Sequence, residues 1–216
     1  VFGNRTFSSL VWHYVTHDTG RDVASFTVDA ASFSKDRHEG LPVVPFEQVA
    51  ALYPPGMHEM LIPVGWTEIN GVRRSRCEQA WQMRYPLATY VSSRASVWPG
   101  MLIGKNCMVF EQAVVQPFAQ LGMNVIVRSG AIIGHHSVVE DHCFIASGAI
   151  AGGNVHIGEQ CFIALGAILR DGVRIAPRCL IGVGAVVIAD TEPDGVYVGN
   201  PARRLEKSPM EVTRGE

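Results

Sequence analysis

The chain has 216 residues, of which 47% are hydrophobic and 18% are charged, and its net charge is −2. This length allows a sizeable core and two compact units, and the composition excludes a disordered chain. Without an excess of basic residues, binding to a nucleic-acid backbone is not expected. No apolar run approaches 18 residues, so no membrane span is expected either.

Residues 1–88 alternate between helical and extended patterns. Helices are predicted at 7–16, 46–52 and 67–83, with Thr67 as N-cap of the last, and strands at 23–28, 41–44 and 59–64. Pro54 and Pro55 should end the second helix. This alternation predicts a small α/β unit with a parallel sheet.

Polar residues follow the predicted strands of this unit. In open parallel sheets, ligands bind at the carboxyl ends of strands, where helix N-termini favour phosphate. Gly3, Asn4 and Asp29 lie at such ends, and Asn70 belongs to an Asn-x-x-Arg pair with Arg73. These residues are candidate nucleotide contacts. Because a full GxGxxG motif is absent, a purely structural cap remains an equal alternative on these residues alone.

Residues 89–190 contain a six-residue repeat. Stepping by six from Val91 to Val187 meets seventeen positions, of which sixteen are Val, Ile or Leu, without a slip of frame. Chance would place a large aliphatic residue there roughly one time in four or five. A period of six excludes helices as its basis and fits short strands joined by tight corners.

A second ladder of small or β-branched residues runs two positions before the first, from Ala95 to Ala185. Both ladders should point inward, and three hexads should form one triangular coil, so that residues i and i+18 stack. Glycine is frequent directly after the large aliphatic residue, and a residue that adopts φ > 0 should help to form the corner. This hexapeptide pattern is typical of the left-handed parallel β-helix; the handedness follows from that resemblance.

Neither the cysteines nor the histidines have the spacing of a metal site. Cys143, Cys161 and Cys179 are eighteen residues apart, which suits packing in the narrow inward slot better than a metal ladder. The histidine spacing does not match that of β-helical zinc carbonic anhydrases, and no nearby carboxylate completes a zinc site. No metal is expected. Five cysteines without a CxxC pair or a secretory leader pattern predict a reduced, cytoplasmic protein.

Four segments carry a family resemblance. They are residues 134–140 (GHHSVVE), 149–158 (AIAGGNVHIG), 182–187 (GVGAVV) and 198–202 (VGNPA). They resemble the sugar acyltransferases of the sialic-acid O-acetyltransferase and bacillosamine N-acetyltransferase type. The resemblance covers nearly the whole chain and is loose before residue 85. It implies an N-terminal Rossmann-like nucleotide-sugar domain (1–88), a β-helix acyltransferase domain (89–190), a tail that closes the CoA site (191–216) and a homotrimer.

The resemblance also assigns roles within the repeat. His135 matches the general base, and Gly153, eighteen residues further, matches the backbone donor for an oxyanion. The acyl-CoA contacts expected from the coil edge and the tail are Phe144, Leu165, Gly182, Asn200 and Pro201, with Arg203 and Arg204 as candidates for the CoA phosphates. His136 departs from the family, which has Asp or Glu there, and Glu140 and Asp141 are nearby acids in the sequence. Arg128 and Phe144 depart from a family Asn and His, so the acceptor pocket is expected to differ.

The predicted function is an acetyl-CoA-dependent N-acetyltransferase of polysaccharide biosynthesis that acts on a nucleotide-linked amino sugar. A near-neutral base is suited to removing the proton of a weak nucleophile, and the thioester oxyanion needs a preorganised donor. Two alternatives stay open: O-acetylation of a sugar or glycan on the same scaffold, and a non-catalytic trimeric β-helix that binds its ligands. The remaining tail is polar and is expected to be poorly ordered.

Overall fold

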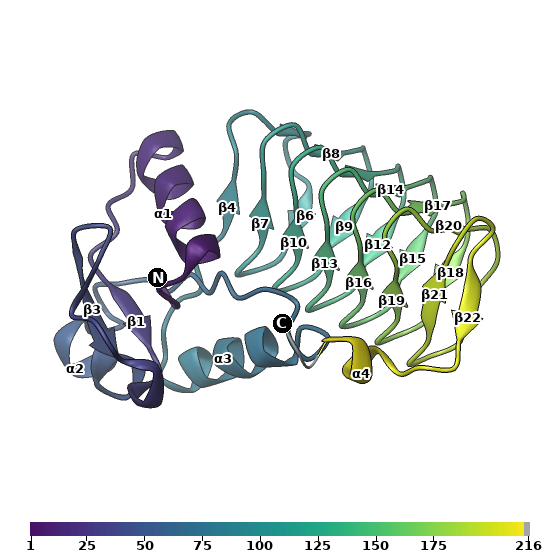
Figure 1. Ribbon diagram of the computed structural model, residues 1–216. Helices are drawn as coiled ribbons and strands as arrows, with labels where there is room; N and C mark the ends of the chain where they lie inside the picture. Colours follow the sequence, from purple (N-terminus) through teal and green to yellow (C-terminus); the bar gives the residue numbers. More distant parts are fainter. Residues whose placement is uncertain (214–216) are drawn as a thin grey trace.

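A computed structural model describes residues 1–213, which form an α/β unit, a β-helix and a C-terminal segment that folds back (Figure 1). No helix within this range is long and apolar enough to cross a membrane. The predicted order of an α/β region followed by a β-helix is confirmed.

The N-terminal unit is a small sheet covered by helices. Its elements are α1 (Thr6–Asp18), β1 (Phe26–Val28), β2 (Arg37–His38), β3 (Leu41–Pro45), α2 (Val49–Leu52) and α3 (Gly71–Gln82), with 3-10 turns at Ala30–Ser32 and Phe46–Gln48. β1 pairs in parallel with β3, β2 pairs antiparallel with β3, and Phe2 forms a parallel bridge to Thr27. The sheet is therefore parallel except for its β2 edge.

Two predictions in this unit need correction. Residues 60–63 of the predicted strand 59–64 are buried, but the segment forms only an isolated bridge, from Met60 to Leu87, instead of a regular strand. The predicted helix at 67–83 begins at Gly71, because Glu68, Ile69 and Asn70 adopt positive φ angles of 54°, 47° and 68°. Three left-handed residues in a row cannot continue an α-helix, so Thr67 is not its N-cap.

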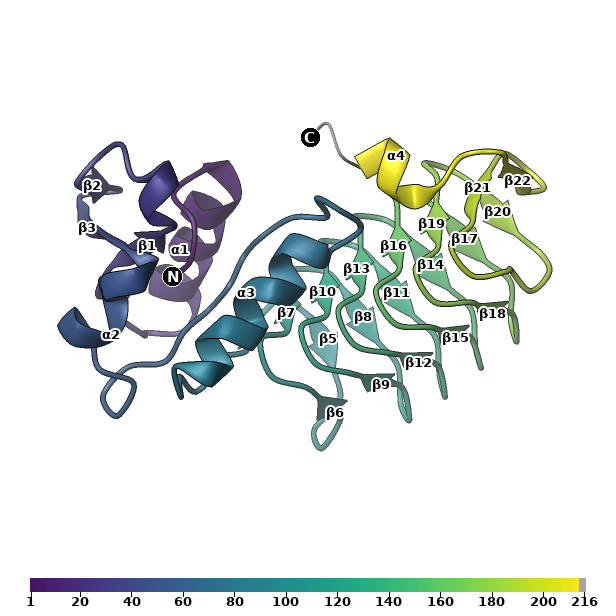
Figure 2. The same ribbon diagram turned by 90° about the horizontal axis from the view of Figure 1, so that it is seen from below.

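The β-helix consists of two-residue strands joined by corners (Figure 2). The strands are β4 (Tyr90–Val91), β5 (Ser96–Val97), β6 (Leu102–Ile103), β7 (Met108–Val109), β8 (Val114–Val115), β9 (Gln120–Leu121), β10 (Ile126–Val127), β11 (Ile132–Ile133), β12 (Val138–Val139), β13 (Phe144–Ile145), β14 (Ile150–Ala151), β15 (His156–Ile157), β16 (Phe162–Ile163), β17 (Ile168–Leu169), β18 (Arg174–Ile175), β19 (Leu180–Ile181) and β20 (Val186–Val187). Every third strand belongs to the same parallel sheet. We name the three sheets by their first strand: the β4, β5 and β6 sheets.

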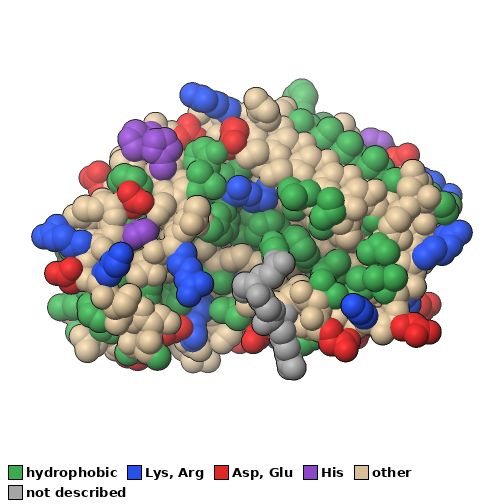
Figure 3. All heavy atoms as spheres, viewed as in Figure 1, with side chains coloured by type: hydrophobic (Ala, Val, Ile, Leu, Met, Phe, Trp, Pro, Cys, Tyr) green, Lys and Arg blue, Asp and Glu red, His purple; other side chains and the backbone are tan. Residues whose placement is uncertain are grey.

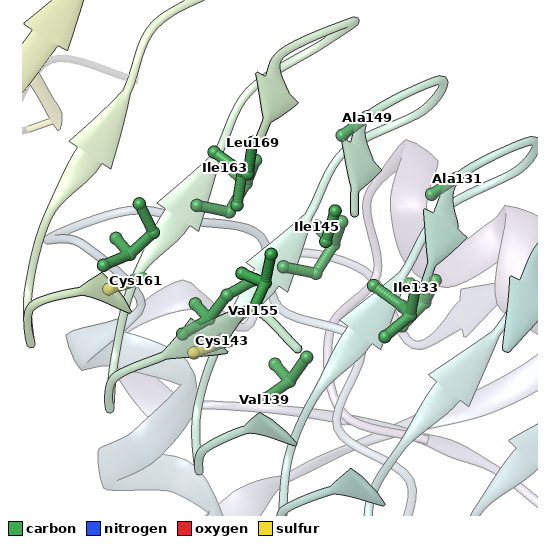
Figure 4. Packing of buried hydrophobic residues seen from close by; sticks show 14 of the residues in the cluster. Ala131, Ile133, Val139, Cys143, Ile145, Ala149, Val155, Cys161, Ile163 and Leu169 are labelled. Atoms are coloured by element: carbon green, nitrogen blue, oxygen red, sulfur yellow. The ribbon is translucent and has the colours of Figure 1, made fainter. Parts of the chain in front are cut away.

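The register between coils is eighteen residues, as the repeat predicts. Ile126 pairs with Phe144, and Ile132 pairs with Ile150. From β5 to β20, the second residue of each strand points inward and contacts one continuous core, which includes the small-residue ladder. Figure 4 shows Ile145 and Ile163 inside the coil with Cys143 beside them. The five cysteines are free and buried, which confirms the packing interpretation.

The corner residue with positive φ lies three positions after the inward aliphatic residue, not directly after it. At this position Asn124, His136 and His142 have φ angles of 59°, 59° and 64°, and Gly148 has 69°. The glycines directly after the aliphatic residue serve another purpose. A Cβ atom on Gly134 would overlap the backbone of the next coil at Gly152. Their requirement is close approach between coils.

The C-terminal segment folds into regular elements within residues 196–213, which differs from the expected poor order; residues 214–216, which the same expectation covers, lie outside the described residues. β21 (Val196–Val198) extends the β4 sheet in parallel, and β22 (Arg203–Leu205) returns antiparallel to it. Between them, the peptide bond before Pro201 is cis. The short helix α4 (Pro209–Thr213) then folds back towards the N-terminal unit, where Thr213 accepts a hydrogen bond from the backbone of Ile69 at 3.0 Å.

A buried arginine joins the N-terminal unit to the β-helix. Arg73 of α3 has no exposed surface and donates seven hydrogen bonds, all to neutral oxygens of the two parts. Among them are the Oδ1 atoms of Asn70 and Asn124 and the carbonyl of His142. Burial lowers the pKa of Arg73 to about 10, so it stays charged at neutral pH. The position of α3 on the coil is thereby fixed.

Candidate active site at a corner of the β-helix

His135 lies at the corner that follows β11, between the β5 and β6 sheets, and its side chain is exposed. Its ring lies over Gly153 of the next coil. A Cβ atom added at Gly153 would be 2.5 Å from both Cε1 and Nε2 of His135. The predicted adjacency of the two residues is therefore confirmed, and only glycine accommodates the ring at this distance.

The hydrogen-bond partners of His135 lie at the same corner of the stack, one in the preceding coil and one in its own coil. Its backbone N–H donates to Gln116 Oε1 at 2.9 Å, and its Nδ1 lies 3.2 Å from Nδ1 of His136. Glu140 binds Nε2 of His156 at 2.7 Å, and Asp141 accepts from another corner, so neither acid orients His135. Within residues 1–213, Nε2 of His135 has no hydrogen-bond partner.

The backbone N–H of Gly153 is already occupied. It donates to Oδ1 of Asp171 at 2.6 Å, from one coil further along. Met123 and Asp141 repeat this arrangement at another corner, with a distance of 2.7 Å. Asp171 is therefore also a structural cap for the corner. Its carboxylate stands where the predicted oxyanion would bind, and the sequence could have revealed it, because Asp171 lies two coils from His135.

An apolar groove follows the outer face of the β4 sheet. Its volume is about 560 Å³, and it contains the predicted contacts Phe144, Leu165 and Gly182. Trp66 stacks on Phe162 in its wall, with ring centroids 4.9 Å apart. Figure 3 shows hydrophobic side chains gathered at the centre of this face. A groove of this shape suits a long, thin ligand with an apolar middle part.

The C-terminal segment forms part of this groove, although not through the predicted residues. Leu205, Lys207 and Val212 line it, whereas Asn200 and Pro201 lie exposed in the turn after β21 and do not. No pattern in the sequence predicts Trp66 or Lys207, because both reach the groove only by the folding back of segments outside the repeat.

Arg128 lies at one end of the groove. Its guanidinium lies 5.0 Å from the ring centroid of Phe7 and 4.4 Å from that of Phe110. Burial lowers its pKa from the ordinary value, and within residues 1–213 its buried Nη1 has no hydrogen-bond partner. A ligand oxygen in the groove could therefore accept a hydrogen bond from it.

The predicted nucleotide contacts divide into two groups. Gly3 has φ +95° and precedes α1, whose N-cap Arg5 makes no side-chain cap, and Asn4 lies between them. Asp29 follows β1 and forms an ion pair with Arg76 at 2.8 Å. These residues lie at the carboxyl edge of the sheet, as predicted.

Asn70 belongs elsewhere. It has no exposed surface, its Nδ2 donates to the carbonyl of Cys161 at 3.0 Å, and its Oδ1 accepts from Arg73. A buried Asn70 with both amide atoms hydrogen-bonded cannot contact a nucleotide, so the prediction for this residue is wrong. Within residues 1–213, no three His, Cys, Asp or Glu side chains are grouped so that they could hold a metal ion.

Comparisons place this arrangement among known proteins. The sequence matches no family model and no curated protein. A His-to-Asn variant of perosamine N-acetyltransferase from Caulobacter crescentus, in complex with CoA and GDP-perosamine, is 21% identical and covers 95% of each chain with a TM-score of 0.87. The acetyltransferase domain of PglB from Neisseria gonorrhoeae, in complex with acetyl coenzyme A, is 26% identical and covers 94% of this chain and 97% of its own, with a TM-score of 0.84.

A third structure, WeeI from Acinetobacter baumannii, is 21% identical with a TM-score of 0.83, and covers 94% of this chain and 97% of its own. All three extend over both the N-terminal unit and the β-helix. The predicted fold is confirmed: this chain has the fold of a perosamine N-acetyltransferase and of the PglB acetyltransferase domain over nearly its whole length.

Proposed function

We propose that this protein is an acetyl-CoA-dependent N-acetyltransferase that acts on a nucleotide-linked amino sugar, with His135 as the general base. The observation that carries the proposal is the exposed ring of His135 over Gly153, with its Nε2 free within residues 1–213. The fold supports it, because structural neighbours were solved with CoA and GDP-perosamine or with acetyl coenzyme A. Reduced thiols fit a cytoplasmic enzyme.

The reaction needs a base and an acceptor for developing charge. The amine nitrogen attacks the thioester carbonyl carbon, and its proton passes to Nε2 of His135. The tetrahedral intermediate then collapses, the carbon–sulfur bond breaks, and the CoA sulfur takes the proton back from the imidazolium. For Gly153 N–H to stabilise the oxyanion, Asp171 must release it, because one N–H cannot serve a carboxylate at 2.6 Å and the oxyanion equally.

The nucleotide sugar fits the edge of the N-terminal sheet. The first turn of α1 contains no acidic residue and lacks a side-chain cap, so its backbone N–H groups are directed at the space beside Asn4 and Arg5. Such a terminus favours a diphosphate. Gly3, with φ +95°, lets the chain turn there without strain, and Asp29 remains a candidate contact.

A homotrimer would unite the two halves of the site. In one copy His135 lies at the corner between the β5 and β6 sheets, whereas the groove lies on the β4 sheet and reaches the corner before the β5 sheet through Leu165. The outer face of the β5 sheet between these corners carries a register of aliphatic residues: Val114, Ile132, Ile150, Ile168 and Val186. Ile150 and Ile168 are 37% and 41% exposed.

This aliphatic face fits a second and a third copy of the chain. The β4 sheet is covered by α1 and the C-terminal segment, and the β6 sheet carries polar residues such as Gln120 and Arg174 at the same positions. Packing three β5 sheets around an axis would set the His135 corner of one copy beside the groove of the next. Symmetric closure of this kind is common for homo-oligomers.

The test is thiol release from acetyl-CoA with a panel of nucleotide amino sugars. We expect turnover with at least one of them, and a loss of about 10²- to 10⁴-fold in kcat for His135→Asn. His17→Asn, an exposed histidine of α1, is the control and should retain full activity. Turnover on a second panel of nucleotide sugars that lack an amine, together with no turnover on the amino sugars, would favour O-acetylation. An absence of acetyl-CoA binding at millimolar concentration would support the non-catalytic alternative and refute both enzymes.

A further inference from the structure

The corner that carries His135 contains a second imidazole without a role in the proposed mechanism. The Nδ1 atoms of His135 and His136 are 3.2 Å apart, and the two rings are nearly perpendicular, at 85°. Adjacent residues rarely face each other in this way. Here the turn makes it possible, because His136 has φ +59° and its side chain leaves the corner in a different direction.

The ring of His136 is held from the preceding coil. It lies on Phe118, eighteen residues earlier, with ring centroids 4.6 Å apart and an angle of 33°. Its backbone N–H donates to the carbonyl of Pro117 at 3.3 Å. Phe118 is itself 69% exposed, so its contact with the imidazole is one of the few that it makes. The orientation of His136 towards His135 is therefore supported on two sides.

Two neutral imidazoles in this geometry share one proton between their Nδ1 atoms. Either His135 donates and keeps Nε2 unprotonated, or His136 donates and His135 carries its proton on Nε2. Only the first arrangement gives a base over Gly153. A tautomer is set by the hydrogen bond that the other ring nitrogen makes, so the partner of Nδ1 decides whether His135 can act.

We propose that His136 is the positioning residue of His135: its Nδ1 lone pair accepts the Nδ1–H of His135 and directs an unprotonated Nε2 towards Gly153. The inference rests on the proposed role of His135. When the amine proton reaches Nε2, the ring becomes an imidazolium, and its Nδ1–H still donates to His136. The hydrogen bond is then charge-assisted and stronger.

His136→Gly and His136→Glu test the proposal. Glycine occupies the same corner position at Gly100 and Gly172, with φ +80° and +74°, so His136→Gly removes the ring without backbone strain. We expect a ten- to hundredfold loss of kcat and KM values within about twofold. His136→Glu should restore at least tenfold of that loss, because a carboxylate also accepts the Nδ1–H of His135.

A His136→Gly variant with the kcat of the unaltered protein would overturn the proposal, as would a His136→Glu variant no more active than His136→Gly. Nitrogen-15 NMR of the unliganded protein, labelled at histidine, tests the pair without any turnover. We expect His135 protonated at Nδ1 and His136 unprotonated at Nδ1; a proton on Nε2 of His135 would refute the assignment. Failure of the proposed function is seen separately, as an absence of acetyl transfer by the unaltered protein.

Discussion

Replacement of Arg73 tests how the N-terminal unit is fixed to the β-helix. Arg73→Met keeps the length and the apolar stem of the side chain but removes all seven donated hydrogen bonds. Three of the buried acceptors, Asn70 Oδ1, Asn124 O and His142 O, have no second donor within residues 1–213. Arg73 holds α3 of the N-terminal unit on the β-helix, so its loss should affect the packing of both parts.

The magnitude follows from two opposing effects. An unsatisfied buried acceptor costs about 1–3 kcal/mol, so three of them cost roughly 3–9 kcal/mol. Removing a buried cation without a carboxylate partner returns roughly 2–3 kcal/mol of desolvation energy. We therefore expect a net loss near 3 kcal/mol for Arg73→Met. For a chain of this size, that lowers the melting temperature by about 6–12 °C.

The assay is thermal unfolding at one fixed protomer concentration, because oligomer stability depends on concentration. Arg74→Met is the matched control on the same helix. Arg74 is 43% exposed and pairs with Glu78 at 2.9 Å and Glu159 at 3.1 Å. The i,i+4 pair contributes about 0.5 kcal/mol and the other exposed pair at most about 1 kcal/mol, so its melting temperature should fall by less than about 6 °C. An Arg73→Met protein within 2 °C of the unaltered one would refute the reasoning.

Three further predictions concern the site. Gly153→Ala should lower kcat at least tenfold with little change in melting temperature, because its Cβ would lie 2.5 Å from the His135 ring. Gly56→Ala, with no atom within 4 Å of its Cβ, is the control. Equal activities of the two variants would contradict the position of the His135 ring over Gly153. Leu165→Glu should raise the KM for acetyl-CoA about tenfold by placing a carboxylate in the groove, whereas Leu165→Met should leave it unchanged. An unchanged KM in Leu165→Glu would show that CoA does not bind in this groove. Ile150→Glu should convert a trimer into monomers, measured by light scattering, and abolish turnover. Leu102 is 65% exposed on the β6 sheet, and Leu102→Glu should change neither the oligomeric state nor the turnover. An unaltered protein that is monomeric would exclude the trimer.

The β-helix follows from the sequence because its rule is local. Each inward aliphatic position from Val97 to Val187 occurs at a fixed step of six, and each coil needs only its neighbours to bury it. The step of eighteen residues per coil also predicts that Gly153 lies beside His135, as the structure shows. What the step did not reveal was the position of the left-handed corner residue, because Asn, Gln, His and Gly all occupy it.

The remaining features depend on contacts between segments far apart in the chain. In the sequence, Asn70 and Arg73 are polar residues near the start of a helix. In the structure, α3 directs both side chains towards the coil, where backbone carbonyl groups accept hydrogen bonds from them. Trp66 and Lys207 reach the groove only because the chain folds back onto the β4 sheet. The sequence by itself therefore determined the coil and the stacking along it. The tertiary structure decided which polar residues are buried, which N–H groups are occupied and which imidazole faces His135, because these depend on distances between atoms that no spacing in the chain specifies.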